Sequence, residues 1–240
     1  MATQEAFLSA FTDHCHALCL KILTLFAIGL HVDPAQGGST WFSSRHSRTL
    51  GPSGCTLRLL YYPSIPEDAD YQPDIDIRAG AHSDYGSITL LFQRPGQPGL
   101  EILTAQGVWE PVYVVPPGTE NDRSPPILVN IGDLLSYWTN GLLRSTVHRV
   151  TFPKGAKRGG EDRYSIAFFC HPVDNTILEP VPSIMTKARV VDGHGNADKW
   201  ENMTAAEHLQ ERLRATYLSL KWDKDGLNVE ASSAEKAESS

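Results

Sequence analysis

The spacing of apolar and polar residues changes from a helical to an extended pattern near residue 54. Between about Glu5 and Ile28, apolar side chains recur every three to four residues, which predicts a long amphipathic helix with Gly29 as its stop. The apolar positions of that helix are Phe7, Phe11, Leu18, Ile22 and Leu25. Residues 28–52 keep no sustained period, so a loop-rich connection is expected there.

After Gly54, short apolar runs separated by turn residues predict a series of strands. The predicted strands are residues 56–62, 87–92, 100–103, 112–115, 127–131, 134–138, 146–152 and 164–170. Short, evenly spaced strands of this kind are typical of a sandwich or jelly roll, and they are enough for two packed sheets. The predicted fold class is therefore mainly β with flanking helices.

The whole chain, residues 1–240, is interpreted as a single domain. Residues 1–50 form a helical lead-in and residues 54–180 form the core in this interpretation. Thr204 to Glu207 reads as a capping box that opens a C-terminal helix over residues 204–222. Residues 230–240 are polar and without period, which predicts a disordered tail.

Composition narrows the classes of partner. The formal charge of −7 and the pI of about 5.7 provide no basic surface for nucleic acid. The four cysteines form no CxxC pair, and no cleavable signal or apolar run approaching twenty residues is evident. These observations favour a cytoplasmic protein without a nucleic-acid or membrane partner.

A histidine and an aspartate stand two residues apart just before the apolar run 87–92. Successive side chains of an extended backbone point to opposite sides, so His82 and Asp84 should face the same way. His148, in another strand-like run, can supply a third ligand. Two histidines and one carboxylate occupy one face of an octahedral ion and suit non-haem Fe(II). The alternative interpretation of the His-x-Asp pair is an exposed turn.

A second group of polar residues follows on the last predicted strand. Its alternation places Arg163, Ser165, Ala167 and Phe169 on one face. A guanidinium fork beside a hydroxyl suits the distal carboxylate of a small diacid. An ordinary surface ion pair is the alternative for Arg163.

With its His-x-Asp, distal His and Arg-x-Ser in this order, the chain resembles the 2-oxoglutarate and Fe(II)-dependent dioxygenases of the isopenicillin N synthase-like family, over about residues 5–180. The resemblance implies a double-stranded β-helix core, of the jelly-roll, cupin-like type. It also implies the following residue roles: iron ligands His82, Asp84 and His148; contacts to the 2-oxoglutarate C5 carboxylate by Arg163 and Ser165; a further co-substrate contact by Tyr62; and a substrate-pocket position for Phe169. Leu60 stands where plant members usually have Asn.

The activity implied by the resemblance is oxidation of a small organic molecule, in specialised metabolism, with O2 and with conversion of 2-oxoglutarate to succinate and CO2. Family members usually carry roughly a hundred residues before the first long helix, a substantial share of a domain. We therefore expect this chain to bind iron and 2-oxoglutarate but to oxidise its primary substrate poorly. Two alternatives stay open: a catalytically impaired scaffold that binds metal and 2-oxoglutarate, and a metal-dependent hydrolase that activates water with the same triad.

Overall fold

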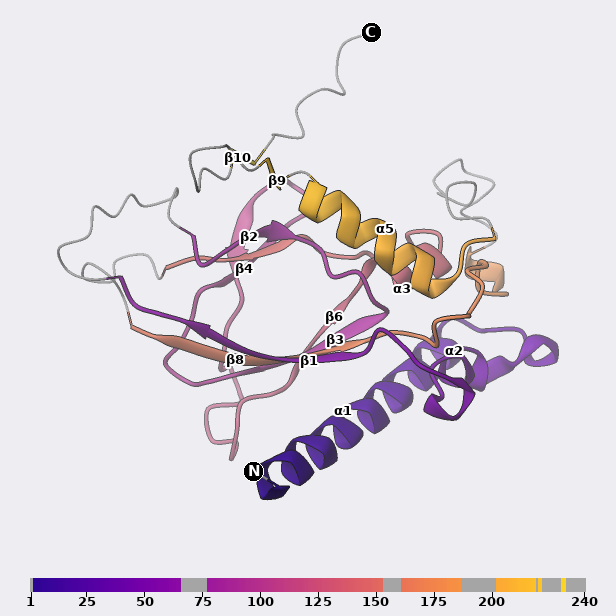
Figure 1. Cartoon of the computed structure of the whole chain (residues 1–240), viewed down its shortest axis with the longest axis horizontal. Helices are drawn as coiled ribbons and strands as arrows, with labels where there is room; N and C mark the ends of the chain where they lie inside the picture. The colour runs from indigo at the N-terminus through magenta and orange to yellow at the C-terminus, as the bar shows by residue number, and fades with distance from the viewer. Residues whose placement is uncertain are drawn as a thin grey trace, which may run out of the picture.

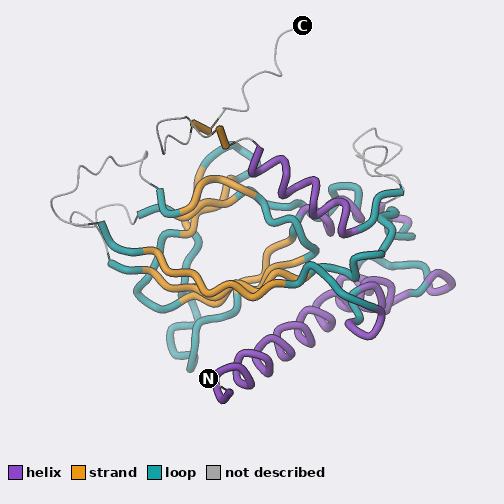
Figure 2. The backbone as a smooth tube through the Cα atoms, in the orientation of Figure 1, coloured by secondary structure: helices purple, strands orange, loops and turns teal. Residues whose placement is uncertain are grey.

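Two four-stranded antiparallel sheets face each other in the computed structural model, which describes residues 2–65, 77–152, 161–186, 202–218, 220–221 and 230–231 (Figures 1 and 2). The first sheet has the order β1 (Thr56–Tyr62), β8 (Arg163–Cys170), β3 (Ile88–Gln93) and β6 (Leu128–Ile131). The second has the order β2 (Ala79–His82), β7 (His148–Val150), β4 (Leu100–Leu103) and β5 (Trp109–Pro111). This arrangement confirms the predicted fold class, a mainly β jelly roll with flanking helices.

Strand positions follow the sequence pattern most closely in the first sheet. β1 and β4 have the predicted bounds, and β8 begins one residue earlier than predicted. The prediction for residues 112–115 was wrong, because β5 ends at Pro111. The predicted strand 146–152 is limited to the three residues of β7, and β2 was not predicted.

The predicted strand over residues 134–138 was also wrong, since these residues form helix α3 (Asp133–Trp138). Four of its six side chains are buried, and the run is too short for its apolar spacing to distinguish a helix from a strand. Trp138 packs edge-on against Trp41, with ring centroids 5.5 Å apart. These two residues form the centre of the core at the end of the sheets where α3 lies (Figure 1).

Helix α1 (Ala2–Gly29) covers the outer face of the first sheet (Figure 1). Its buried stripe, Cys15, Cys19, Leu23 and Ala27, repeats every four residues. Of the five apolar positions that predicted this helix, Phe11, Leu18 and Ile22 pack against the core. Phe7 and Leu25 are 69% and 67% exposed, so the helix is confirmed but these two side chains lie outside its buried face.

By length and composition alone, residues 3–29 of α1 could also cross a membrane: an 18-residue stretch within them has a mean hydropathy of 1.3, and 28% of that stretch is buried. Core helices meet the same criterion. Cys19 and Leu23 are fully buried against the first sheet, so this face of α1 serves the core.

The connection from α1 to β1 contains four short helices rather than only loop. They are η1 (Pro34–Gln36), η2 (Gly38–Thr40), α2 (Trp41–Arg45) and η3 (Arg48–Leu50). They carry Trp41 and Phe42 into the core.

Helix α5 (Ala205–Leu218) lies beside α3 near the second sheet (Figure 1). The predicted capping box is confirmed: Glu207 Oε2 accepts hydrogen bonds from the backbone N–H and the hydroxyl of Thr204, and Thr204 Oγ1 accepts from Glu207 N. The helix ends at Leu218 and not at residue 222. A two-stranded ladder joins β9 (Leu220–Lys221) to β10 (Glu230–Ala231), and residues 232–240 of the predicted tail lie outside the described residues.

Candidate metal and co-substrate site

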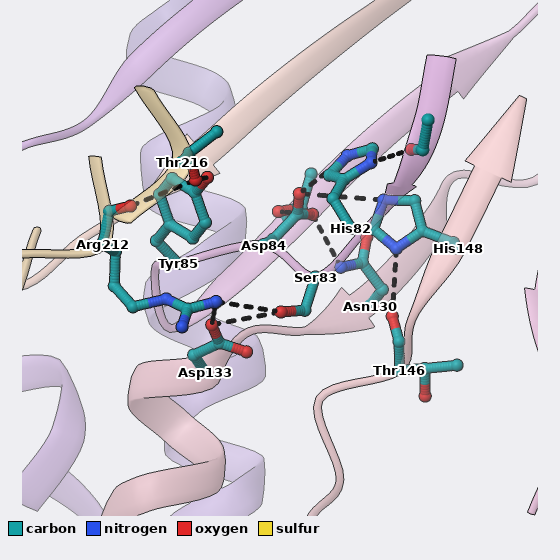
Figure 3. A network of polar contacts seen from close by, with 12 residues as sticks. His82, Ser83, Asp84, Tyr85, Asn130, Asp133, Thr146, His148, Arg212 and Thr216 are labelled. Atoms are coloured by element: carbon teal, nitrogen blue, oxygen red, sulfur yellow. Dashed lines mark hydrogen bonds and ion pairs between the residues drawn. The ribbon is translucent and has the colours of Figure 1, made fainter. Parts of the chain in front are cut away.

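Three side chains with metal-binding atoms meet at one wall of the space between the sheets (Figure 3). His82 ends β2, Asp84 follows in the next loop, and His148 begins β7. Their possible ligand atoms lie within 4.8 Å of one another, with Asp84 Oδ1 at 3.9 Å from His82 Nε2 and 3.7 Å from His148 Nε2. No other group of three His, Cys, Asp or Glu side chains comes this close in the described part of the chain.

Strand pairing explains how residues so distant in sequence come together. His82 and His148 are direct partners in the β2–β7 ladder, and their ring centroids are 4.4 Å apart. Asp84 lies two residues further along the chain and faces the same side as His82, whereas Ser83 and Tyr85 face away from the metal-binding atoms (Figure 3). The alternation expected from the sequence thus holds beyond the end of β2.

Backbone carbonyls fix the orientation of both imidazoles. His82 Nδ1 lies 2.8 Å from Gly80 O, and His148 Nδ1 lies 3.0 Å from Thr146 O. Because a carbonyl oxygen only accepts hydrogen bonds, each Nδ1 carries the proton and each Nε2 presents a lone pair. Both lone pairs are therefore available to a metal ion beside Asp84.

The two carboxylate oxygens of Asp84 have different surroundings. Oδ2 accepts hydrogen bonds from Thr89 Oγ1 at 2.6 Å and from Asn130 Nδ2 at 2.8 Å. Thr89 and Asn130 are direct partners across β3 and β6, so the first sheet supplies both donors. Oδ1 remains as the oxygen that faces the histidines. Sequence analysis missed Thr89 and Asn130, because their role depends on a cross-strand pairing that no local motif records.

Arg163 begins β8 of the first sheet, lines the pocket between the sheets and is only 2% exposed. Its Nη1 donates to Ser165 Oγ and its Nη2 to Gln93 Oε1, both at 3.2 Å, while its Nε has no hydrogen-bond partner. None of the ion pairs among the described residues supplies it with a carboxylate. Burial lowers the pKa of this guanidinium. Because the side chain is buried and has no carboxylate partner among the described residues, the alternative of an ordinary surface ion pair is excluded. Gln93 is a third residue, after Thr89 and Asn130, that the sequence did not reveal.

One pocket contains both groups. Its wall includes the triad, Arg163 and Ser165, and also Tyr62 and Phe169. Tyr62 pairs with Arg163 across β1 and β8, and its ring centroid lies 5.5 Å from the guanidinium carbon. The cavity between these side chains is small, with a volume of about 90 Å³. All seven residues predicted for the site thus line a single pocket.

Most of the remaining wall is apolar. The other lining residues are Leu60, Leu91, Leu100, Ile102, Leu128, Val150 and Ala167, with the polar residues Thr89, Asn130 and Thr146. Seven of these ten residues are hydrophobic, so the wall outside the predicted site residues is mainly apolar.

The model of the 2OG-Fe(II) oxygenase superfamily matches residues 53–172, which is half of the chain. The chain belongs to this superfamily. The matched region of the chain runs from just before β1 to just after β8, so it contains both sheets and the pocket between them.

Similar proteins agree with this placement. The chain is 41% identical over 207 residues to a UPF0676 protein of Schizosaccharomyces pombe, covering 86% of this chain and 55% of that protein. It is 34% identical to a proline hydroxylase, buaE, of Petromyces alliaceus, covering 89% of this chain and 60% of that protein. Among solved structures, a full-length Neurospora crassa protein in complex with alpha-KG matches with a TM-score of 0.71 and 33% identity, over 89% of this chain and 57% of that one.

The chain thus spans between 55% and 60% of the length of these relatives. The Neurospora protein has also been solved in complex with alpha-KG and thymine.

Proposed function

We propose that this chain binds Fe(II) through His82, Asp84 and His148, binds 2-oxoglutarate between that ion and Arg163, and oxidises a small organic molecule with O2. The observation that carries the proposal is a single pocket with a facial ligand set and a buried guanidinium that lacks a carboxylate.

The three ligands fit an iron ion by their chemistry and their spacing. Two imidazole nitrogens and one carboxylate oxygen form the donor set typical of non-haem Fe(II) oxygenases. Two ligand atoms about 2.1 Å from an ion and at right angles would lie about 3 Å apart. The separations of 3.7 Å and 3.9 Å are slightly wider, so small side-chain movements would bring these atoms to the distances of metal ligands. Iron held by these residues would activate O2, while conversion of 2-oxoglutarate to succinate and CO2 would supply part of the electrons that reduce O2 and oxidation of the substrate would supply the rest.

Arg163 and Ser165 fit the carboxylate of a co-substrate that is remote from the metal. Arg163 is a buried cation whose present hydrogen bonds go only to the neutral groups of Ser165 and Gln93. A carboxylate would provide the missing charge and accept two parallel N–H donors. The hydroxyl of Ser165 adds a further donor, and Tyr62 closes the same side of the pocket. This arrangement favours the oxygenase over a hydrolase, because activation of water by the triad has no need of a diacid site.

The substrate is proposed to be a small organic molecule of specialised metabolism. The apolar wall around Phe169 would keep water away from the reacting atoms and hold a compact, largely uncharged molecule. The proline of the Petromyces relative's name and the thymine bound to the Neurospora protein support a substrate of this size.

The test is to measure succinate formed from 2-oxoglutarate under air by the Fe(II)-loaded chain. We expect succinate in the wild type and none after His148→Ala, which removes one ligand atom. Arg45→Lys serves as the control, because Arg45 pairs with Glu179 on the outside of the fold. Binding of 2-oxoglutarate without succinate would support the scaffold alternative, and failure to bind it would refute the proposal.

A further inference from the structure

The loop that follows His82 is fixed by backbone hydrogen bonds on one side. Asp133 N donates to Asp84 O at 2.7 Å and Leu134 N donates to Gly86 O at 3.1 Å, so the start of α3 holds this loop. Gly132 permits the approach: a Cβ at this position would lie 2.2 Å from Gly86 O. The backbone around Asp84 is therefore positioned by α3.

The side chains of Ser83, between the two ligands His82 and Asp84, and of Tyr85, directly after Asp84, lie towards helix α5 (Figure 3). Arg212 Nη2 forms an ion pair with Asp133 Oδ2 at 2.9 Å and lies 3.5 Å from Ser83 Oγ, while Ser83 Oγ donates to the same Asp133 oxygen at 3.1 Å. The Arg212 guanidinium carbon lies 5.2 Å from the centroid of the Tyr85 ring. The Tyr85 hydroxyl is hydrogen-bonded to Thr216, one turn further along α5.

We propose that Arg212 is a positioning residue for the metal centre, through which α5 holds the ligand-bearing loop in the orientation that directs His82 and Asp84 at one point. The inference rests on the proposed metal site. Arg212 touches neither ligand side chain in the described contacts; it acts through Ser83 and Tyr85, on the opposite side of the backbone.

The alternation of side chains provides the mechanical link. Ser83 and Tyr85 face α5, while His82 and Asp84 face the pocket. A rotation of the backbone that released Ser83 from Asp133 would turn the neighbouring ligands by the same movement. The Arg212 and Asp133 side chains are 33% and 19% exposed, so the pair is partly screened and its larger effect should be on geometry rather than on stability.

The experiment uses Co(II) as the probe, because it is coloured and its absorption bands report coordination geometry. The full chain is titrated with Co(II) as wild type, Arg212→Met, Arg212→Lys and Arg214→Met. Arg214 is a matched control, since it lies on the same helix but is exposed. We expect Arg212→Met to weaken Co(II) binding about tenfold, in the range seen when groups that orient metal ligands are removed. Its Co(II) spectrum should also change.

Arg212→Lys should restore part of the affinity, because an ammonium keeps the ion pair with Asp133 but loses the planar fork. Circular dichroism without metal verifies folding, and if Arg212→Met does not fold, the milder Arg212→Lys decides the test by the same two readouts. Wild-type affinity and spectrum in the deciding variant would refute the role of Arg212. An equal loss in Arg214→Met would refute it too. A wild type that binds no Co(II) would instead refute the metal site, and with it the proposed function.

Discussion

Replacing Arg163 by lysine tests how the proposed co-substrate is held. The guanidinium offers two parallel N–H donors to a carboxylate, whereas an ammonium keeps the charge but not the fork. A hydrogen bond to a charged group is worth about 1.5 to 3 kcal/mol. Loss of one such bond should therefore weaken 2-oxoglutarate binding roughly ten- to a hundredfold. Arg163 makes no described contact with the triad, so metal affinity should stay the same.

The assay is calorimetric titration of 2-oxoglutarate into the anaerobic Fe(II)-loaded protein, with Arg45→Lys as the control. Thermal unfolding provides an independent measure. At 2-oxoglutarate one hundred times the wild-type Kd, the ligand should stabilise the wild type by about 2.7 kcal/mol, and a variant with tenfold weaker binding by only about 1.4 kcal/mol. Equal affinities in wild type and Arg163→Lys would remove Arg163 from the co-substrate site.

Lowering the pH from 7 towards 4 should decrease the free energy of unfolding by up to about 3 kcal/mol because of His46. Burial lowers the pKa of His46 to about 4 in the folded protein, whereas the same imidazole takes up a proton near pH 6.5 in the unfolded chain. Between pH 4 and 6.5 the unfolded state binds more protons than the folded state, so the contribution of His46 to stability is complete above pH 6.5 and is lost as the pH falls. Urea unfolding curves at several pH values measure this loss. A free energy of unfolding that does not fall on acidification would contradict a buried, neutral His46 imidazole. Cys55 should be the first thiol alkylated by iodoacetamide at pH 7, because its pKa is lowered to about 6, with a hydrogen bond from Cys170 as the largest cause. Peptide mass spectrometry that finds another cysteine modified first would count against this prediction. Gly132→Ala should lower the free energy of unfolding by about 1 to 3 kcal/mol or more, because its Cβ would meet Gly86 O at 2.2 Å; an unchanged urea midpoint would show that the loop can move away.

The sequence predicted the elements whose local pattern and tertiary environment agree. In β8 one face lines the pocket and the other packs towards α1, so the alternation that placed Arg163 and Ser165 together is also the alternation of the structure. His82 and Asp84 were predictable for the same reason. His148 could be proposed as a third ligand from its strand-like run, and the family resemblance supported this choice. Its position beside His82 could not be derived, because the β2–β7 pairing has no local signal and β2 itself was not predicted.

The apolar–polar pattern led to wrong or incomplete predictions in two helices, α3 and α1. In α3, Leu134, Leu135 and Trp138 are all fully buried, so a short apolar run could not distinguish helix from strand. In α1 the apolar rhythm predicted Phe11, Leu18 and Ile22, which do pack against the core, together with Phe7 and Leu25, which are exposed. The most buried stripe also contains two cysteines and an alanine, which a pattern based on large apolar side chains does not single out.

The proposed contact of α5 with the loop that carries His82 and Asp84 could not be predicted from the sequence, although these two residues were themselves predicted. An arginine on a polar helix face is usually solvated, and Arg212 resembles Arg214 until the tertiary structure brings it to Asp133 and Ser83. Once the fold exists, the two-residue spacing of His82 and Asp84 has a second consequence: the intervening residue must face outwards, where it can be held. Because of this alternation, contacts of Ser83 and Tyr85 with α5 also set the backbone orientation of His82 and Asp84. In the proposed role of Arg212, a substitution on α5 therefore changes the geometry of the metal ligands although Arg212 does not line the pocket.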